Sequence, residues 1–377
     1  MRPFRIGMIG YGGIGRVHML GYRSIPYHYG LPADTVQVVG VATSRAETAE
    51  KAAAEIGCDF WTDDYRALLD RDDIDVVTIT TPNDVRVELV EAAAAAGKHI
   101  FCEKPMARTA EEARRMAEAV ERAGVRAAVN FNFRFYPAVI RARQLVDEGF
   151  LGRVFSYRGT FYRASYIDPD KPLSWRLSRE HAGGGALHDL GSHTIDMAYY
   201  LLGEFESVLG VTETFITERP VSKGAAERGP VDVDDIALLE TRMASGALGS
   251  LQISRYATGV TNELSIEIFG EHGALRFDSH DPSWLWAYDA REGGSAVEGF
   301  RRVSVGGRFP GQIAPEVTMA PGFTPTFAAA QYAFFKAIDE GAEPAPNFRD
   351  GLHVQAVMDA ALASSDAPRW VPLSEVL

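Results

Sequence analysis

The sequence has little cysteine and no cysteine cluster. Only Cys58 and Cys102 occur among 377 residues. Neither belongs to a spaced cluster of cysteines, so we expect neither a disulfide framework nor a structural zinc site. Such sparse cysteine is typical of a protein from a reducing compartment.

Long apolar runs and an excess of basic charge are also missing. No stretch of about 18 uncharged apolar residues is present, and Met1–Arg5 leads straight into an apolar run rather than a secretory leader. The 51 acidic and 38 basic residues give a formal net charge of -13, which repels phosphate backbones and anionic lipid. We therefore expect a cytoplasmic protein that binds neither nucleic acid nor membranes.

The first third of the chain predicts an α/β domain. Hydrophobic residues make up 46% of the chain, and its length exceeds that of one ordinary core. Short apolar runs alternate with helical patterns, which is typical of a doubly wound parallel sheet covered on both faces. The expected strands are 4–9, 36–42, 59–61, 76–80, 99–102 and 126–129, with helices at 46–56, 85–96 and 110–123. This domain is expected to span residues 1–130.

The pattern changes after residue 130. Period-two alternation at 154–162, 237–241, 249–254 and 264–269 predicts a large, mostly antiparallel sheet. Helices are expected at 137–148, 185–202, 326–340 and 351–364. Residues 131–377 are therefore predicted to form an α+β domain, with a C-terminal helix able to pack back on the first domain. Segments 220–230 and 305–321 lack periodicity and are candidate lids or oligomer contacts.

A glycine-rich turn follows the first predicted strand. Gly10, Gly12, Gly13, Ile14 and Gly15 form a GxGxxG pattern that opens a predicted helix. In this context the glycines permit a tight turn and close approach of a pyrophosphate, and the helix N-terminus offers free N–H groups. A plain strand–helix turn is the alternative. We interpret the motif as a dinucleotide site.

The end of the second strand bears on the choice of cofactor. An NAD-selective site usually carries a carboxylate there, but this chain has Thr43, Ser44 and Arg45. Hydroxyls and a guanidinium suit a 2′-phosphate, which slightly favours NADP over NAD, although Arg45 is equally compatible with a solvated position.

Lys104 follows the fifth predicted strand, in the sequence Glu103-Lys104-Pro105. Ligands of open α/β sheets bind at the carboxyl ends of the strands, so Lys104 is expected near the nicotinamide. There its ammonium could stabilise a developing alkoxide. A solvated surface lysine is the alternative.

A third motif runs from Gly183 to Asp196. Asp189 and His193 are four residues apart and therefore share one helix face, with Asp196 continuing the stripe. Histidine can accept the hydroxyl proton during alcohol oxidation. A metal site that adds His181 and His188 is the alternative, but His188 points away from Asp189 on a helix, so we expect no metal.

Together these motifs resemble the glucose–fructose oxidoreductase, inositol dehydrogenase and rhizopine-catabolism family (Gfo/Idh/MocA) over nearly the whole chain. Gly10–Gly15 matches its cofactor loop, Glu103-Lys104-Pro105 its EKP signature, and Gly183–Asp196 its GGGxLxDxGxHxxD segment. The resemblance implies an N-terminal Rossmann domain and a C-terminal domain whose open sheet often mediates oligomerisation. It also implies that Lys104, Asp189 and His193 are the catalytic trio.

The resemblance extends to further residues. Segments 159–161, 172–176 and 229–235 resemble the branch of sugar, anhydrosugar and inositol dehydrogenases. The cofactor-binding residues implied, in addition to those above, are Thr81, Pro82, Asn83, Glu103, Asn132, Trp175 and Arg176; Arg134 lies in the same segment as Asn132.

The resulting hypothesis is a dehydrogenase acting on a polyol. His193 removes a proton from a ring hydroxyl, Lys104 polarises the oxygen, and hydride passes to C4 of NADP or NAD. Asp189 and the aromatic residues Tyr162, Tyr166 and Trp175 hold the substrate. An NAD-dependent glycosidase and a non-catalytic cofactor-sensing protein remain alternatives. A homodimer or homotetramer is expected.

Overall fold

The computed structural model describes residues 1–377 except 292–298, 306–308, 310–312 and 314–321. The described residues form two compact units. The first comprises residues from 1–107, 111–135 and 313–352, and the second those from 108–110, 136–312 and 353–377. The sequence analysis places a single boundary after residue 130, whereas the structure groups a late segment of the chain with the first unit.

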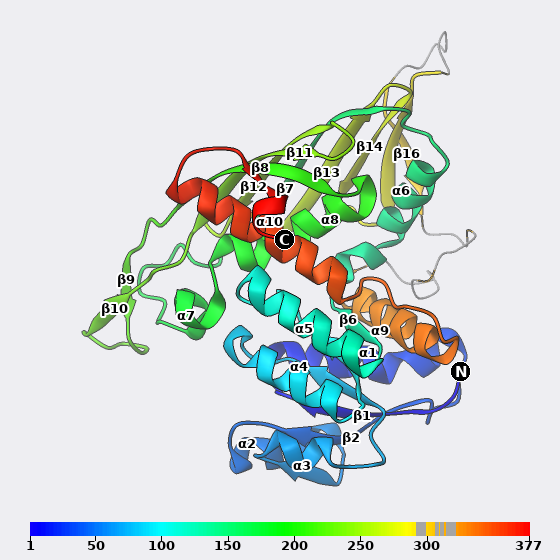
Figure 1. Ribbon diagram of the computed structural model, residues 1–377, viewed down its shortest axis with the longest axis vertical. Helices are drawn as coiled ribbons and strands as arrows, with labels where there is room; N and C mark the ends of the chain where they lie inside the picture. The colour runs from blue at the N-terminus through cyan, green and yellow to red at the C-terminus, as the bar shows by residue number, and fades with distance from the viewer. Residues whose placement is uncertain (292–298, 306–308, 310–312, 314–321) are drawn as a thin grey trace. The chain divides into compact units, whose positions relative to one another are not determined.

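A six-stranded parallel sheet forms the centre of the first unit (Figure 1), in the order β3-β2-β1-β4-β5-β6. Its strands are β1 (Phe4–Ile9), β2 (Val36–Ala42), β3 (Phe60–Thr62), β4 (Val76–Ile79), β5 (His99–Cys102) and β6 (Ala127–Val129). Every residue of β4 and β6 is buried, as expected for parallel strands covered on both faces. The predicted doubly wound domain is confirmed.

Helices cover this sheet. They are α1 (Gly13–Tyr29), α2 (Ala46–Ile56), α3 (Tyr65–Leu69), α4 (Arg86–Ala95), α5 (Ala110–Ala123) and α9 (Phe323–Asp339), with short 3-10 turns η1 (Asn83–Val85) and η2 (Asn132–Phe135). The late helix α9 adds aromatic side chains to the core: Phe335 stacks on Phe4 with 4.9 Å between ring centroids, and Phe334 packs against Phe101. These contacts tie α9 to the first unit.

The second unit contains a nine-stranded sheet in the order β16-β15-β14-β13-β7-β12-β11-β8-β17. The strands are β7 (Val154–Tyr162), β8 (Phe205–Glu213), β11 (Ile236–Met243), β12 (Leu248–Ser254), β13 (Glu263–Gly270), β14 (Gly273–Asp278), β15 (Trp284–Asp289), β16 (Arg301–Ser304) and β17 (Val371–Pro372). Strands β7 and β12 pair in parallel, and the other neighbours pair antiparallel. The predicted, mostly antiparallel sheet is confirmed.

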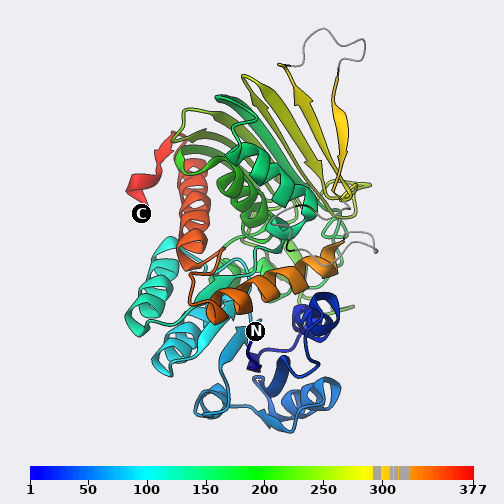
Figure 2. The same ribbon diagram turned by 90° about the vertical axis from the view of Figure 1, so that its right-hand side faces the viewer.

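Helices lie against one face of this sheet (Figure 2). Those on the sheet are α6 (Pro137–Asp147), the π-helical turn η4 (Leu187–Gly191), α8 (Ser192–Leu202) and α10 (Phe348–Asp366). The short elements η3 (Trp175–Leu177), α7 (Arg179–Ala182) and η5 (Leu373–Glu375) complete the unit. Glycine allows close approach: a Cβ at Gly159 of β7 would lie 2.9 Å from Thr194 of α8, and one at Gly210 of β8 would lie 2.6 Å from the backbone of Ala361 in α10. Gly159 therefore lies on the face of the sheet that the helices cover. Every second residue of β7, counted from Gly159, points to the same face.

The two aperiodic segments have different outcomes. Segment 220–230 connects β9 (Glu218–Pro220) and β10 (Arg228–Pro230), which pair as a small antiparallel ribbon. Most of 305–321 lies outside the described residues. None of the helices in the described part of the chain combines the length and apolar character of a membrane span.

Candidate active site

The glycine-rich turn joins β1 to α1 as the motif predicts. Gly10 has a φ of 89°, which a residue with a Cβ rarely adopts. The Thr80 hydroxyl donates to the Gly10 carbonyl (2.8 Å), and a Cβ at Gly15 would lie 3.3 Å from that same carbonyl oxygen. Gly10 is therefore favoured by the backbone conformation of the turn, and Gly15 by its close approach to the Gly10 carbonyl.

Gly12 and Gly13 serve a different purpose. A Cβ at either position would meet nothing within 4 Å, so the backbone here faces open space. Gly12 is the N-cap of α1, and no side chain caps this helix. The Thr81 hydroxyl, at the end of the adjacent β4, is buried without a hydrogen-bond partner in the described chain. An open, uncapped helix N-terminus with an unused hydroxyl nearby fits the diphosphate of a dinucleotide.

The end of β2 has no carboxylate. The Thr43 hydroxyl donates to the Arg45 carbonyl (3.0 Å) and lies 2.6 Å from the Thr48 hydroxyl. Arg45 is the N-cap residue of α2, and Ser44 and Arg45 are both exposed. Thr43 therefore fixes the turn into α2, while Ser44 and Arg45 present their side chains to solvent.

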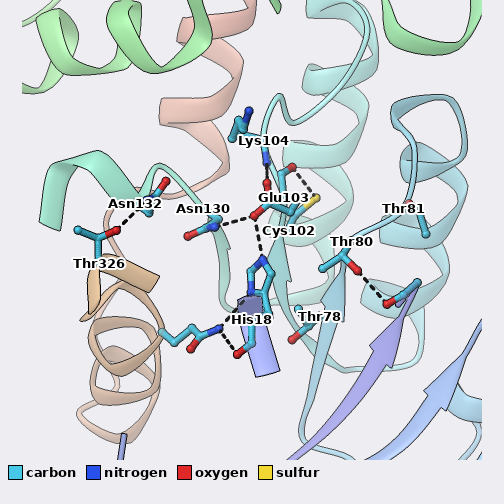
Figure 3. A network of polar contacts seen from close by, with 12 residues as sticks. His18, Thr78, Thr80, Thr81, Cys102, Glu103, Lys104, Asn130, Asn132 and Thr326 are labelled. Carbon is cyan, nitrogen blue, oxygen red and sulfur yellow. Dashed lines mark hydrogen bonds and ion pairs between the residues drawn. The ribbon is translucent and has the colours of Figure 1, made fainter. Parts of the chain in front are cut away.

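Lys104 lies just after β5, above a buried polar network (Figure 3). The Glu103 carboxylate, 3% exposed, accepts hydrogen bonds at Oε1 from His18 Nε2 (2.8 Å) and Asn130 Nδ2 (2.6 Å). Its Oε2 accepts from the backbone N–H of Lys104 (3.2 Å). Gln331 of α9 donates to the His18 carbonyl (3.2 Å) and lies against its ring. Glu103 thus fixes the backbone of Lys104 by accepting a hydrogen bond from its N–H.

Burial alone would raise the pKa of Glu103. The hydrogen bond from His18, the charges of His18 and Lys104, and the Asn130 amide outweigh burial and lower this pKa from 4.5 to about 2. Glu103 is therefore a carboxylate at neutral pH, and it provides negative charge directly beneath Lys104.

Arg86 joins the ends of β4 and β5. Its guanidinium donates to the carbonyls of Thr81 (2.7 Å) and Glu103 (2.8 Å) and also contacts the Pro105 carbonyl. Arg86 is 3% exposed, so this cation is buried among backbone oxygens. It fixes the two strand ends that carry the predicted cofactor and catalytic segments.

Asp234 shapes the turn that precedes Asp189 in the second unit. Its carboxylate accepts hydrogen bonds from the backbone N–H groups of Gly185 and Leu187, both at 2.7 Å. A Cβ at Gly185 would lie 1.8 Å from the Asp234 carbonyl oxygen. Gly185 is therefore needed for the close contact with Asp234. The Asp234 carboxylate accepts from the free N–H groups at the start of the helix, as an N-cap side chain would.

Asp189 and His193 lie on either side of the junction between η4 and α8. The helix expected at 185–202 thus begins with a π-helical turn, a feature frequent at functional sites. Asp189 Oδ2 accepts from Arg255 Nη2 at 3.2 Å, and the Asp189 side chain is 24% exposed. His193 is 5% exposed and packs against the Phe161 ring of β7.

The chain matches two family models. Residues 4–131 match the oxidoreductase family with an NAD-binding Rossmann fold, and residues 139–276 match the GFO/IDH/MocA C-terminal domain. This chain belongs to the Gfo/Idh/MocA oxidoreductases. The resemblance drawn from its motifs is confirmed, and the chain is an oxidoreductase with an NAD-binding domain.

Its relatives within the Gfo/Idh/MocA family include dehydrogenases of small polyols. Levoglucosan dehydrogenase of Pseudarthrobacter phenanthrenivorans is 39% identical, with 100% of both chains covered. Inositol 2-dehydrogenase of Rhizobium meliloti is 30% identical over 98% of this chain and 99% of its own. A solved levoglucosan dehydrogenase in complex with NADH and levoglucosan is 38% identical, covers 99% of this chain and 100% of its own, and has a TM-score of 0.92.

Several residues implied by the family resemblance can now be located in the first unit. Asn83 is 2% exposed and begins η1 after Pro82. Asn132 donates to the Thr326 hydroxyl of α9 (2.7 Å; Figure 3), and Arg134 pairs with Asp350. Asn132 and Arg134 therefore hold late segments of the chain in the first unit.

Tyr162 requires a correction. Neighbouring residues of a strand point to opposite faces, and Phe161 contacts His193. Tyr162 therefore points to the other face, where its hydroxyl donates to the exposed Gln252 (2.6 Å). The structure thus places Tyr162, predicted to bind substrate, on the face opposite His193; the sequence did not show which side of β7 carries α8.

The other aromatic candidates lie on the loop after β7. Tyr166 is 7% exposed and covers the Arg255 guanidinium, whose Cζ is 4.6 Å from the ring centroid. Trp175 begins η3 and stacks with the exposed Arg176, with Cζ 4.3 Å from its ring. Tyr166 thus belongs to the Asp189 cluster through Arg255.

His188, a member of the alternative metal site, has partners of its own. It is buried and lies 3.2 Å from the Arg108 carbonyl and from the Gln355 amide. No group of three or more possible ligands that could hold a metal occurs among the described residues.

Sequence reasoning missed four residues of these clusters: His18, Arg86, Asp234 and Arg255. All four are buried charged or polar groups, and three of them have partners far along the chain: 85 positions for His18, 66 for Arg255 and 49 for Asp234. Asp234 lies in the segment 229–235 that marks the family branch, so the sequence held a signal for its importance but none for its role.

Proposed function

We propose that this oxidoreductase transfers hydride between a nicotinamide cofactor and a ring hydroxyl or ketone of a sugar, anhydrosugar or cyclitol. The observation that supports this most is full-length similarity to levoglucosan dehydrogenase at 39% identity, together with intact Lys104, Asp189 and His193. Relatives that act on inositol support the same class of substrate.

Bound nicotinamide supplies the hydride acceptor, and the chain supplies the polar groups. His193 accepts the proton of the reacting hydroxyl at an imidazole nitrogen. Lys104, held by Glu103 through its backbone, stabilises negative charge on the substrate oxygen. Asp189 accepts a hydrogen bond from a neighbouring hydroxyl and so orients the ring.

Two variants test these roles. In Lys104→Met and His193→Gln, we expect kcat with a sugar or cyclitol substrate to fall by about 100-fold or more, the usual scale for a lost acid–base or electrostatic group. The affinity for NADH, measured by fluorescence titration, should change little in either variant. Lys51→Met serves as the control, because this lysine lies on the exposed surface of α2 and pairs with Glu47. Wild-type turnover in both active-site variants would refute the assignment.

The substrate is identified with a panel of anhydrosugars, aldoses and inositols, followed by the absorbance of reduced nicotinamide. An NAD-dependent glycosidase would instead release the aglycone of a glycoside without net formation of NADH. Homodimers or homotetramers, which we propose by analogy with the open sheet of this family, are distinguished by light scattering.

We further propose that the chain accepts NADP in addition to NAD. The support is the hydroxyl and guanidinium side chains of Ser44 and Arg45 at the end of β2, where no carboxylate follows the strand. Arg45→Ala should weaken binding of NADPH by about 10-fold, the usual scale of a charge-assisted hydrogen bond, and leave NADH affinity unchanged. Equal effects on both cofactors would contradict this proposal.

A further inference from the structure

Arg255 is a buried cation beside the proposed substrate site. It follows β12, is 1% exposed, and donates from Nη2 to Asp189 Oδ2 (3.2 Å). Its Nε and Nη1 are buried without an acceptor in the described chain. Burying a guanidinium is costly unless a counter-charge accompanies it. The Asp189 carboxylate provides that counter-charge.

The guanidinium is held in place from its other side. The Tyr166 ring covers it in a cation–π contact, with 4.6 Å from Cζ to the centroid. Tyr166 is in turn fixed by Arg219, which is fully buried and donates to the carbonyls of Tyr166 (2.5 Å) and Asp168 (2.6 Å). Arg255 therefore occupies one position between an immobilised ring and Asp189.

The backbone of Asp189 has separate support. Asp234 binds the N–H groups of Gly185 and Leu187, and the Asp189 N–H donates to the Gly185 carbonyl (3.0 Å). The π-helical turn thus depends on Asp234, whereas Arg255 binds the carboxylate of Asp189. Loss of Arg255 would remove this ion pair and leave the hydrogen bonds of the turn in place.

We propose that Arg255 is a positioning residue that fixes the Asp189 carboxylate as a charged acceptor for one hydroxyl of the polyol substrate. This inference rests on the proposed role of Asp189. One Asp189 oxygen is engaged by Arg255, so the carboxylate has a single preferred orientation in which to meet a hydroxyl. Arg255 thereby contributes to the choice among substrates that differ in the position of that hydroxyl.

A double-mutant cycle tests the proposal, with variants Arg255→Met, Asp189→Asn and the two combined. Arg255→Met should lower kcat/KM for the sugar or cyclitol substrate by about 10- to 100-fold, the scale of a lost charge-assisted hydrogen bond. Affinity for NADH should stay within about 2-fold of wild type. In the Asp189→Asn background, Arg255→Met should cost no more than about 3-fold further, because residues that act through one another are not additive. Arg255→Lys should recover part of the lost activity.

Two controls separate a positioning role from a general effect on folding. Arg242→Met removes an exposed guanidinium from neighbouring β11 and should leave kcat/KM unchanged. Tyr166→Leu removes the ring over Arg255 and should resemble Arg255→Met. If Arg255→Met does not fold, the same cycle with Arg255→Lys measures the coupling to Asp189.

The possible failures can be told apart. An equal loss from Arg255→Met in both backgrounds, or wild-type activity of Arg255→Met beside an impaired Asp189→Asn, would overturn the inference alone. Wild-type activity of Asp189→Asn would overturn the proposed role of Asp189 and the inference with it.

Discussion

Replacing Glu103 by glutamine probes the buried network beneath Lys104. A carboxylate whose pKa falls from 4.5 to about 2 on folding contributes about 3 kcal/mol to stability. Because the folded-state pKa is the lower one, this contribution is complete above about pH 4.5 and is lost as the pH falls towards 2. The network should therefore make the wild-type protein sensitive to acid.

Glu103→Gln keeps part of the network and removes the charge. The amide oxygen of the new glutamine can still accept hydrogen bonds from His18 and Asn130. Its NH₂ group, however, faces the backbone N–H of Lys104, which in the wild type donates to Glu103 Oε2. We expect the variant to be less stable than wild type by about 2–3 kcal/mol at neutral pH, since a charged hydrogen-bond acceptor is lost. The difference should shrink steadily between about pH 4.5 and pH 2.

Urea unfolding followed by circular dichroism, repeated at several pH values, measures this difference. Glu47→Gln is the control, because Glu47 is 75% exposed and pairs with Lys51 on the surface of α2, where ion pairs contribute little. Its stability curve should run parallel to that of wild type. The reasoning would be refuted if wild type and Glu103→Gln had the same free energy of unfolding at neutral pH, or if the difference between them stayed constant down to acid pH.

Two glycine substitutions are expected to have opposite effects. Gly185→Ala would place a Cβ 1.8 Å from the Asp234 carbonyl oxygen, so we expect a loss of about 3 kcal/mol and a Tm lower by roughly 10 °C in calorimetry; an unchanged Tm would contradict the close approach. Gly12→Ala places a Cβ in open space, so Tm should be unchanged while the Kd for NADH rises about 10-fold or more, because the methyl group occupies the space expected for the diphosphate. Unchanged NADH affinity in Gly12→Ala would argue against the cofactor assignment.

Short-range features of this protein could be predicted from the sequence. Gly10–Gly15 forms its turn from adjacent residues, and strands such as 4–9, 36–42 and 99–102 were predicted with the bounds that the structure has. Motifs of a few residues sufficed to identify the Gfo/Idh/MocA family and to single out Lys104, Asp189 and His193 as candidates.

Other features depended on residues that are distant in sequence. His18, Asn130 and Gln331 meet around Glu103 from three different elements, and α9 joins the first unit through aromatic packing with β1 and β5. A sequence shows that such residues are present, but it does not show which buried polar groups become partners.

The amino-acid sequence alone determined the alternation of strands and helices in the first domain, the glycine turn and the family, because these depend on periodicity and on neighbouring residues. Only the tertiary structure decided that Arg255 meets Asp189, that Asp234 holds the turn at Gly185, and that Tyr162 points away from His193. The physical reason is that a strand shows alternation but not which face a helix will cover, and a charged side chain does not reveal its counter-charge until the chain has folded.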